Sequence, residues 1–183
     1  MIQGSLNVRE IEEKDIVLLA HYWFQAEEDF LIRLGVDLKK MPGRKDFEQM
    51  LKQQIVSAYL KKAAYALIWE VDEIPVGHSN INNIAMGKEA YMHLHLWKPE
   101  LREKGIGNRL VKMSLPLYFN NFNLERLISE PRAINIAPIR TLEKVGFEYE
   151  KTYLTIPGSI NYQQEVSRWI MTKDQFERNI EQS

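Results

Sequence analysis

One short segment constrains the fold of this chain more than any other. Arg102-Glu-Lys-Gly105-Ile-Gly107 lies between an expected strand at residues 91–97 and an expected helix at about residues 107–122. Glycines in such a turn let backbone N–H groups converge on a phosphate at the N-terminus of the helix. Residues 98–112 also contain five basic and two acidic side chains. The segment therefore predicts an anion site, with a phosphate group as the first candidate.

The glycine pattern does not match the two common nucleotide-binding loops. A Walker loop needs Gly-Lys-Ser/Thr after four intervening residues, and a dinucleotide-binding loop needs a third small residue where this chain has Leu110. Neither ATP nor NAD is favoured. Because a lone Gly-x-Gly turn is more often an ordinary strand-to-helix connection, a second element is needed before the segment indicates a function.

That second element follows about thirty residues downstream, as Asn135-Ile-Ala-Pro-Ile-Arg-Thr-Leu-Glu-Lys-Val-Gly-Phe147. Together the two motifs resemble the GCN5-related N-acetyltransferases (GNAT), which carry Arg/Gln-x-x-Gly-x-Gly/Ala after their fourth strand and Asn-x-x-Ser…Glu-Lys-x-Gly-Phe after their fifth. The order of the two motifs and the spacing between them match the family pattern. The resemblance extends more loosely from about residue 6 to residue 171.

Apolar spacing along the chain predicts alternating strands and helices. The expected strands lie at residues 6–8, 64–71, 76–81, 91–97, 127–129, 147–155 and 164–171, and the expected helices at residues 16–23, 47–58, 107–122 and 135–145. Pro116 predicts a kink or an early end in the third of these helices. No repeat or linker divides the chain, so residues 1–183 are expected to form a single domain. With the resemblance, this order implies an α/β (α+β) fold: a mixed, mostly antiparallel central sheet flanked by helices.

The resemblance also implies which residues bind acetyl-CoA. The backbone from Arg102 to Asn108 would wrap its pyrophosphate, Leu96 and Trp97 would pair with the pantetheine arm, and Asn135 would bond the same arm. Asn135 would serve equally well as a helix N-cap. The full set of expected cofactor residues is Leu96, Trp97, Arg102, Glu103, Lys104, Gly105, Ile106, Gly107, Asn108, Asn135 and Arg140.

Acetyl transfer to an amine needs a base, because an alkylamine has a pKa of about 10.4 and is protonated at neutral pH. Alternation along residues 91–97 places Tyr91, His93, His95 and Trp97 on one face. His93 is the first candidate for the base and His95 the second, since histidine titrates near 6.5. The alternative is that both are ordinary strand histidines. His78 could face the same cleft but is more often structural, and His21 is expected to pack within its helix.

The resemblance further implies an oxyanion donor, the backbone N–H of Leu96 or Trp97, freed by a bulge in the fourth strand. The chain departs from the family pattern at two positions. Leu142 stands where many members place a tyrosine acid, and Pro138 stands where serine is common. A thiolate with a thiol pKa near 8.5 can leave without an acid. Otherwise a substitute acid is needed, with three candidates: Tyr118, Tyr149 and Tyr153.

Composition limits the partners and the compartment. The 24 Lys and Arg nearly balance the 25 Asp and Glu, which argues against nucleic acid or an anionic membrane as partner. The absence of cysteine excludes disulfides, thiolate metal sites and a cysteine nucleophile, and no metal is expected. The chain starts without a basic and apolar leader, so we expect a cytoplasmic protein. The oligomeric state stays open, with a homodimer as one candidate.

The sequence therefore predicts an N-acetyltransferase acting from acetyl-CoA on a primary amine of a small molecule or peptide. A catalytically silent acyl-CoA-binding module is the main alternative, and a generic phosphate-binding α/β domain is another if both motifs are accidental. No motif in the sequence indicates which amine is the acceptor. The acidic run Glu27-Glu28-Asp29, near Trp23, would either attract a cationic amine or form a solvated helix face.

Overall fold

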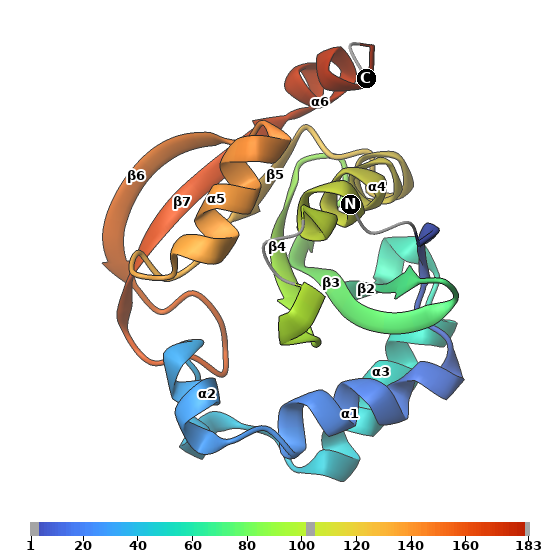
Figure 1. Cartoon of the computed structure of the whole chain (residues 1–183), viewed down its shortest axis with the longest axis vertical. Helices are drawn as coiled ribbons and strands as arrows, with labels where there is room; N and C mark the ends of the chain where they lie inside the picture. The colour runs from blue at the N-terminus through green and yellow to red at the C-terminus, as the bar shows by residue number, and fades with distance from the viewer. Residues whose placement is uncertain (1–3, 102–104, 182–183) are drawn as a thin grey trace.

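A computed structural model describes residues 4–101 and 105–181. Its strands form one seven-stranded sheet in the order β1-β2-β3-β4-β5-β7-β6 (Figure 1). The strands are β1 Leu6–Glu10, β2 Ala64–Val71, β3 Ile74–Ala85, β4 Glu89–Leu96, β5 Arg126–Ser129, β6 Glu148–Thr155 and β7 Gln164–Thr172. The α-helices are α1 Ile16–Phe24, α2 Glu28–Arg33, α3 Arg44–Val56, α4 Ile106–Phe122, α5 Ile136–Val145 and α6 Lys173–Glu181.

The sheet is antiparallel at every pairing except that of β4 with β5, which is parallel. The parallel ladder is short: it joins Glu89–Tyr91 to 126–128, whereas β4 continues to Leu96. β5 ends at Ser129, and Pro131, which has no N–H to donate, follows two residues later. Within the described residues, the pairing of β4 with β5 extends no further than Tyr91, and we call the place beyond this pairing the β4/β5 gap.

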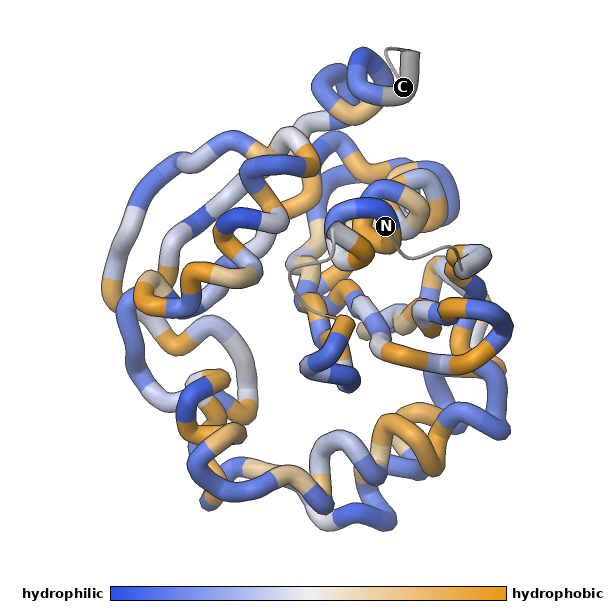
Figure 2. The backbone as a smooth tube through the Cα atoms, in the orientation of Figure 1, coloured by the Kyte–Doolittle hydropathy of each residue, from blue (hydrophilic) through white to orange (hydrophobic). Residues whose placement is uncertain are grey.

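Helices cover both faces of the sheet. On one face α4, α5 and α6 pack against alternate strand residues such as Leu67 and Met92, and on the other α1 and α3 pack against Ala66 and Ile68. In Figure 2 the hydrophobic residues concentrate in the central strands and in α4. Each fully buried Leu or Phe side chain stabilises the fold by about 1.5–3 kcal/mol. The expected mixed, mostly antiparallel sheet flanked by helices is confirmed.

Several local expectations need correction. α4 does not end early at Pro116 but continues to Phe122. The β2–β3 turn is only two residues long, with positive φ at Asp72 and Glu73, and β3 extends to Ala85 instead of ending near residue 81. Helices α2 and α6 were not predicted. α2 has only six residues, too few for the apolar period of a helix to show in the sequence.

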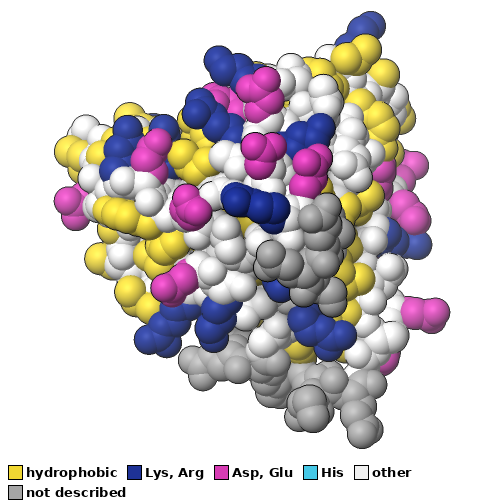
Figure 3. Space-filling view, turned by 90° about the horizontal axis from the view of Figure 1, so that it is seen from above, with side chains coloured by type: hydrophobic (Ala, Val, Ile, Leu, Met, Phe, Trp, Pro, Cys, Tyr) yellow, Lys and Arg dark blue, Asp and Glu magenta, His cyan; other side chains and the backbone are white. Residues whose placement is uncertain are grey.

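Two further observations concern the charge of the surface and the length and apolar character of the helices. On the face shown in Figure 3, acidic and basic side chains are intermixed. Within the described residues, no helix has the length and apolar character needed to cross a membrane.

Candidate active site

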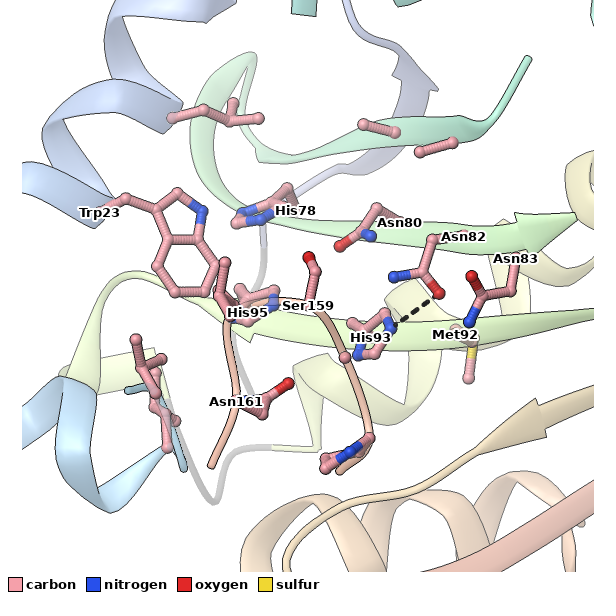
Figure 4. Close-up of a pocket in the computed structure, with 18 of the residues that line it drawn as sticks. Trp23, His78, Asn80, Asn82, Asn83, Met92, His93, His95, Ser159 and Asn161 are labelled. Atoms are coloured by element: carbon pink, nitrogen blue, oxygen red, sulfur yellow. Dashed lines mark hydrogen bonds between the residues drawn. The ribbon is translucent and has the colours of Figure 1, made fainter. Parts of the chain in front are cut away.

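A cleft of about 780 Å³ lies on the sheet face that carries His93 and His95. Its floor comes from β3 and β4, and its walls from α1, α3 and the loop between β6 and β7 (Figure 4). That loop is fixed to the segment after α2, because Asn161 Nδ2 donates to the Gly35 carbonyl at 2.8 Å and the Asp37 N–H donates to the Ile160 carbonyl at 2.8 Å. The cleft is therefore bounded by segments far apart in the sequence.

Three histidines gather on the floor of this cleft. His78 and His95 are cross-strand partners, and their rings stack with centroids 4.5 Å apart. The Trp97 indole Nε1–H donates to His78 Nδ1 at 2.7 Å, so Nδ1 of His78 carries the lone pair. The Tyr22 hydroxyl lies 3.2 Å from His95 Nδ1. These contacts hold two of the three imidazoles in fixed orientations.

His93 differs from the other two histidines in that no hydrogen bond from a described residue engages its Nδ1 atom. Its Nε2 lies 3.3 Å from the Asn82 side-chain oxygen, and an amide oxygen can only accept, so Nε2 holds the proton. Nδ1 is then the nitrogen with the lone pair. Burial lowers the pKa of His93 to about 4, with the Glu130 carboxylate acting in the opposite direction. His93 is therefore neutral at physiological pH and keeps the lone pair on Nδ1.

The histidines make folding stability depend on pH. Burial lowers the pKa of His78 to about 3, that of His93 to about 4, and that of His95 well below its usual value. The unfolded chain, with histidine pKa values near 6.5, binds protons that the folded chain does not. Stability is therefore full above about pH 6.5 and falls as the pH drops towards about 4.

We expect the melting temperature to decrease over this window, with each histidine contributing up to about 1.4 kcal/mol per pH unit. Calorimetry across the range for the wild type and for His78→Gln measures the effect. The variant should show a shallower dependence, because carboxylates titrate equally in both proteins. Identical slopes would mean that His78 does not titrate differently on folding.

The N-terminus of α4 follows β4 along the chain and faces Thr141 of α5. Gly105 precedes the helix in a left-handed conformation, with φ of 74°, and no acidic residue stands in the first turn. Among the described residues outside its own helix turn, the nearest atom to a Cβ added at Gly107 would be Thr141 Oγ1 of α5, at 4.0 Å. Asn135 lines the cleft at the N-cap position of α5, but its side chain makes no capping hydrogen bond. Arg102, Glu103 and Lys104 lie outside the described residues.

The expectation of a bulge in the fourth strand is wrong at Trp97. The register of β4 with β3 runs from Leu96 to Tyr91 without a shift, and the Trp97 N–H donates to the Val76 carbonyl at 2.9 Å. There is thus no bulge that frees the Trp97 amide. The Met92 carbonyl instead accepts from the Ser129 hydroxyl of β5, at 2.9 Å. Because alternate residues face opposite neighbours, the backbone of Leu94 and Leu96 faces the β4/β5 gap.

Comparison with known proteins identifies this arrangement. The family model for the acetyltransferase (GNAT) domain matches residues 5–148. The chain belongs to the GNAT acetyltransferase family.

Individual relatives share a shorter stretch or the fold alone. Identity is 33% over 75 residues with a kanamycin resistance protein from Rhizobium radiobacter and with the aminoglycoside N(6')-acetyltransferase type 1 of Klebsiella pneumoniae. This stretch is 41% of the chain but spans only 64% and 34% of those two proteins. Spermidine N-acetyltransferase from Vibrio cholerae, solved with CoA and spermine, superposes with a TM-score of 0.75 at 17% identity, covering 94% of this chain and 98% of that one. At that identity the likeness is one of fold.

The tyrosines that could replace the missing GNAT acid lie elsewhere. Leu142 is fully buried in the core, where its side chain packs instead of reaching a cofactor. Tyr118 is also buried and bonds the Ser79 hydroxyl at 2.6 Å, Tyr149 is exposed on β6, and Tyr153 bonds the Glu130 carboxylate. None of these three tyrosines is among the described residues that line the cleft.

One further expectation is wrong for this GNAT chain, because His21 is exposed instead of packed within its helix. For the acidic run 27–29, the alternative of a solvated helix face is the one that agrees with the structure. The run is exposed at the start of α2 and contributes no residue to the described lining of the cleft. Within the described residues, no cluster of three or more His, Asp or Glu side chains is arranged to hold a metal ion.

Sequence reasoning missed several residues that line the cleft. These are the amides of Asn80, Asn82, Asn161 and Gln164, together with Glu130 and Arg132. The sequence contained a signal only for Asn80 and Asn82. His78, Asn80 and Asn82 alternate along β3, and a strand extended beyond residue 81 would have placed them opposite His93 and His95. The others come from loops and strand ends whose proximity depends on the tertiary fold.

Proposed function

We propose that residues 1–183 form one acetyltransferase domain that moves an acetyl group directly from acetyl-CoA to a primary amine of a small molecule or peptide. The observation that carries the proposal is the β4/β5 gap, where β4 and β5 separate at residues that also line the cleft containing His93, just before the chain enters α4. Membership of the GNAT family and the CoA bound in the Vibrio cholerae structure support it. We also propose a cytoplasmic location, because a chain with no cysteine gains nothing from an oxidising compartment.

The residues around the gap fit acetyl-CoA. The first N–H groups of α4, at Ile106, Gly107 and Asn108, have no partner inside the helix and would receive the diphosphate. The amides of the pantetheine arm would pair with the gap-facing backbone of Leu94, as an added strand does at a sheet edge. The Asn135 side chain, which makes no capping hydrogen bond to α5, would bond the same arm. Arg140, exposed on α5, and the segment 102–104 are further proposed contacts.

The proposed chemistry is a direct displacement. The amine nitrogen forms a bond to the acetyl carbon, the bond from that carbon to sulfur breaks, and CoA leaves as a thiolate. His93 Nδ1 accepts the proton of the amine, directly or through water, with His95 as the second candidate. The gap-facing backbone N–H groups of β4 would stabilise the charge that develops on the thioester oxygen. The thiolate then takes up the proton or leaves unaided, since a thiol pKa near 8.5 makes it a tolerable leaving group.

Two measurements test this function. Titration calorimetry with acetyl-CoA and with CoA should give binding, and a panel of amines with acetyl-CoA should release free thiol, detected with a thiol-reactive dye. The protein contains no cysteine, so it adds no background to this assay. The absence of heat with either cofactor would overturn the proposal.

A catalytically silent acyl-CoA-binding module is a second candidate. It is favoured by one observation: Leu142 is buried in the core at the position where many GNAT members carry a tyrosine acid. Intact acetyl-CoA binding combined with no thiol release on any amine would support this module over the enzyme.

A further inference from the structure

The cleft described above has an unusual balance of charge for a site that would accept an amine. Among the described residues that line it, the basic side chains are Lys40, Lys61, Lys62 and Arg132, and the only acidic one is Glu130. An alkylammonium or a polyamine carries positive charge at neutral pH, so this lining repels it.

The single acidic residue is already neutralised. The Glu130 carboxylate lies 2.5 Å from Arg168 Nε and accepts from the Tyr153 hydroxyl at 2.5 Å. Arg168 itself comes from β7 and lies over the Tyr153 ring. Glu130 thus has both a cationic partner and a hydroxyl donor, and releasing it to bind an ammonium group would leave Arg168 without its main counter-charge.

Two of the basic residues also have partners. Lys40 Nζ donates to the Asn161 carbonyl at 2.8 Å and lies 3.8 Å from the Asp37 carboxylate. Lys62 donates to the Gln54 carbonyl, burial lowers its pKa, and the nearby Glu10 carboxylate acts in the opposite direction. Lys61 is exposed at the rim.

Arg132 differs from these lysines. Its Nη1 donates to the carbonyls of Ile32 and Arg33, at 3.3 and 3.0 Å, and its guanidinium lies over the Tyr162 ring, 5.5 Å from the centroid. These contacts hold the side chain in place but supply no negative charge. Within the described part of the chain, no carboxylate lies within ion-pair distance of Arg132. A fixed guanidinium with an uncompensated charge is suited to bind a carboxylate.

The other polar groups of the cleft are neutral hydrogen-bonding groups. The side chains of Asn80, Asn82 and Asn83 lie along β3, and Asn161 and Gln164 come from the β6–β7 loop and the start of β7. Gln164 is 6% exposed, and its Oε1 atom has no hydrogen-bond partner. An orphaned buried acceptor can be satisfied by an N–H group of a ligand.

We propose that the acceptor is an amino carboxylate: a small molecule whose primary amine is acetylated near His93 while its carboxylate pairs with Arg132. This inference rests on the proposed function and names its substrate class. The same charge balance selects against polycationic amines such as spermidine and kanamycin, because each additional ammonium group meets an excess of positive charge in the cleft.

The test uses acceptors of equal length that differ only in their far end: 6-aminohexanoate, 6-aminohexanamide and 1,6-diaminohexane, with shorter homologues of each. We expect kcat/KM for thiol release to be at least about tenfold higher for the carboxylate than for the amide, and lowest for the diamine. Added salt should reduce the rate with the carboxylate and raise that with the diamine. A higher kcat/KM for the diamine at every length would overturn the inference while leaving the acetyltransferase proposal intact.

Variants of Arg132 test whether this residue causes the preference for a carboxylate acceptor. Arg132→Gln should reduce the preference for carboxylate over amide to about one, mainly through KM, and Arg132→Lys should retain part of it. Arg178→Gln on α6 is the matched control, because it removes the same charge away from the cleft. An unchanged preference in folded Arg132→Gln would rule out Arg132 as the carboxylate partner.

A binding experiment keeps the inference testable even without turnover. Calorimetry with the two acetylated products should show tighter binding of 6-acetamidohexanoate than of N-acetyl-1,6-diaminohexane. Equal or reversed affinities would contradict the inference. A complete lack of thiol release with every amine would instead count against the proposed function.

Discussion

Replacing His93 with alanine should lower kcat by about 10²- to 10⁴-fold, the range typical of losing a general base, while the dissociation constant of acetyl-CoA changes less than about twofold. The reason is that His93 lies on the cleft face of β4, whereas the cofactor is expected to contact the gap-facing backbone of the same strand. Stopped-flow or steady-state thiol release gives kcat, and calorimetry gives the cofactor affinity.

Two controls make this result specific. His21→Ala removes an exposed histidine outside the cleft and should leave kcat within about twofold of the wild-type value. Added imidazole should restore part of the activity of His93→Ala, because it supplies a base to the space left open. Wild-type kcat in a folded His93→Ala protein would remove this residue from the mechanism and direct attention to His95.

The pH profile offers an independent check on His93. With a pKa of about 4, its neutral form predominates above about pH 5, so kcat should show no inflection near 6.5. The remaining pH dependence of kcat/KM should follow deprotonation of the amine acceptor and differ between amines of different pKa. An inflection near 6.5 shared by all acceptors would mean that the catalytic base titrates as an ordinary exposed histidine.

The second large effect is expected at Gly107. Gly107→Val should weaken acetyl-CoA binding by roughly 5- to 900-fold, because its branches would fill the space between the start of α4 and Thr141 of α5. Three or four phosphate contacts to a helix N-terminus, each contributing about 0.3–1 kcal/mol, would be lost. The fold should tolerate the change, since among the described residues outside the helix turn the nearest atom to the added Cβ is Thr141 Oγ1, at 4.0 Å.

Gly107→Ala is the matched variant, because a single methyl group fits the open space and alanine favours a helix over glycine by about 1 kcal/mol. It should bind acetyl-CoA within a few-fold of the wild type and unfold at the same or a higher temperature. Calorimetry and thermal unfolding on both variants separate affinity from stability. If Gly107→Val binds acetyl-CoA as tightly as the wild type does, the diphosphate lies elsewhere.

Most of the scaffold could be predicted from local pattern. The glycine turn, the Asn135 helix and the alternation of residues 91–97 each depend on neighbours within a few positions, and the structure has Gly105 at the start of α4 and His93 and His95 together on one face. The boundaries that failed did so for local reasons as well. Pro116 is accommodated inside α4, and β3 begins at Ile74, directly after the turn at Asp72 and Glu73, instead of at residue 76.

The chemistry of the cleft depended on contacts that no local pattern contains. Burial, and with it the lowered pKa of His93, follows from α1, α3 and the β6–β7 loop packing over one face of β3 and β4. The occupied Trp97 amide depends on the register with β3, and the excess positive charge depends on Glu130 meeting Arg168 while Arg132 meets only carbonyls and a ring.

By itself the sequence determined the family, the order of strands and helices, and the strand that carries the histidines, because periodicity and turn chemistry act over a few residues. Only the tertiary structure decided which of the polar side chains share the cleft, which are already paired, and what charge an acceptor meets there. Those properties arise from electrostatics and desolvation between segments as distant as residues 32 and 132, and such distances become short only when the chain folds.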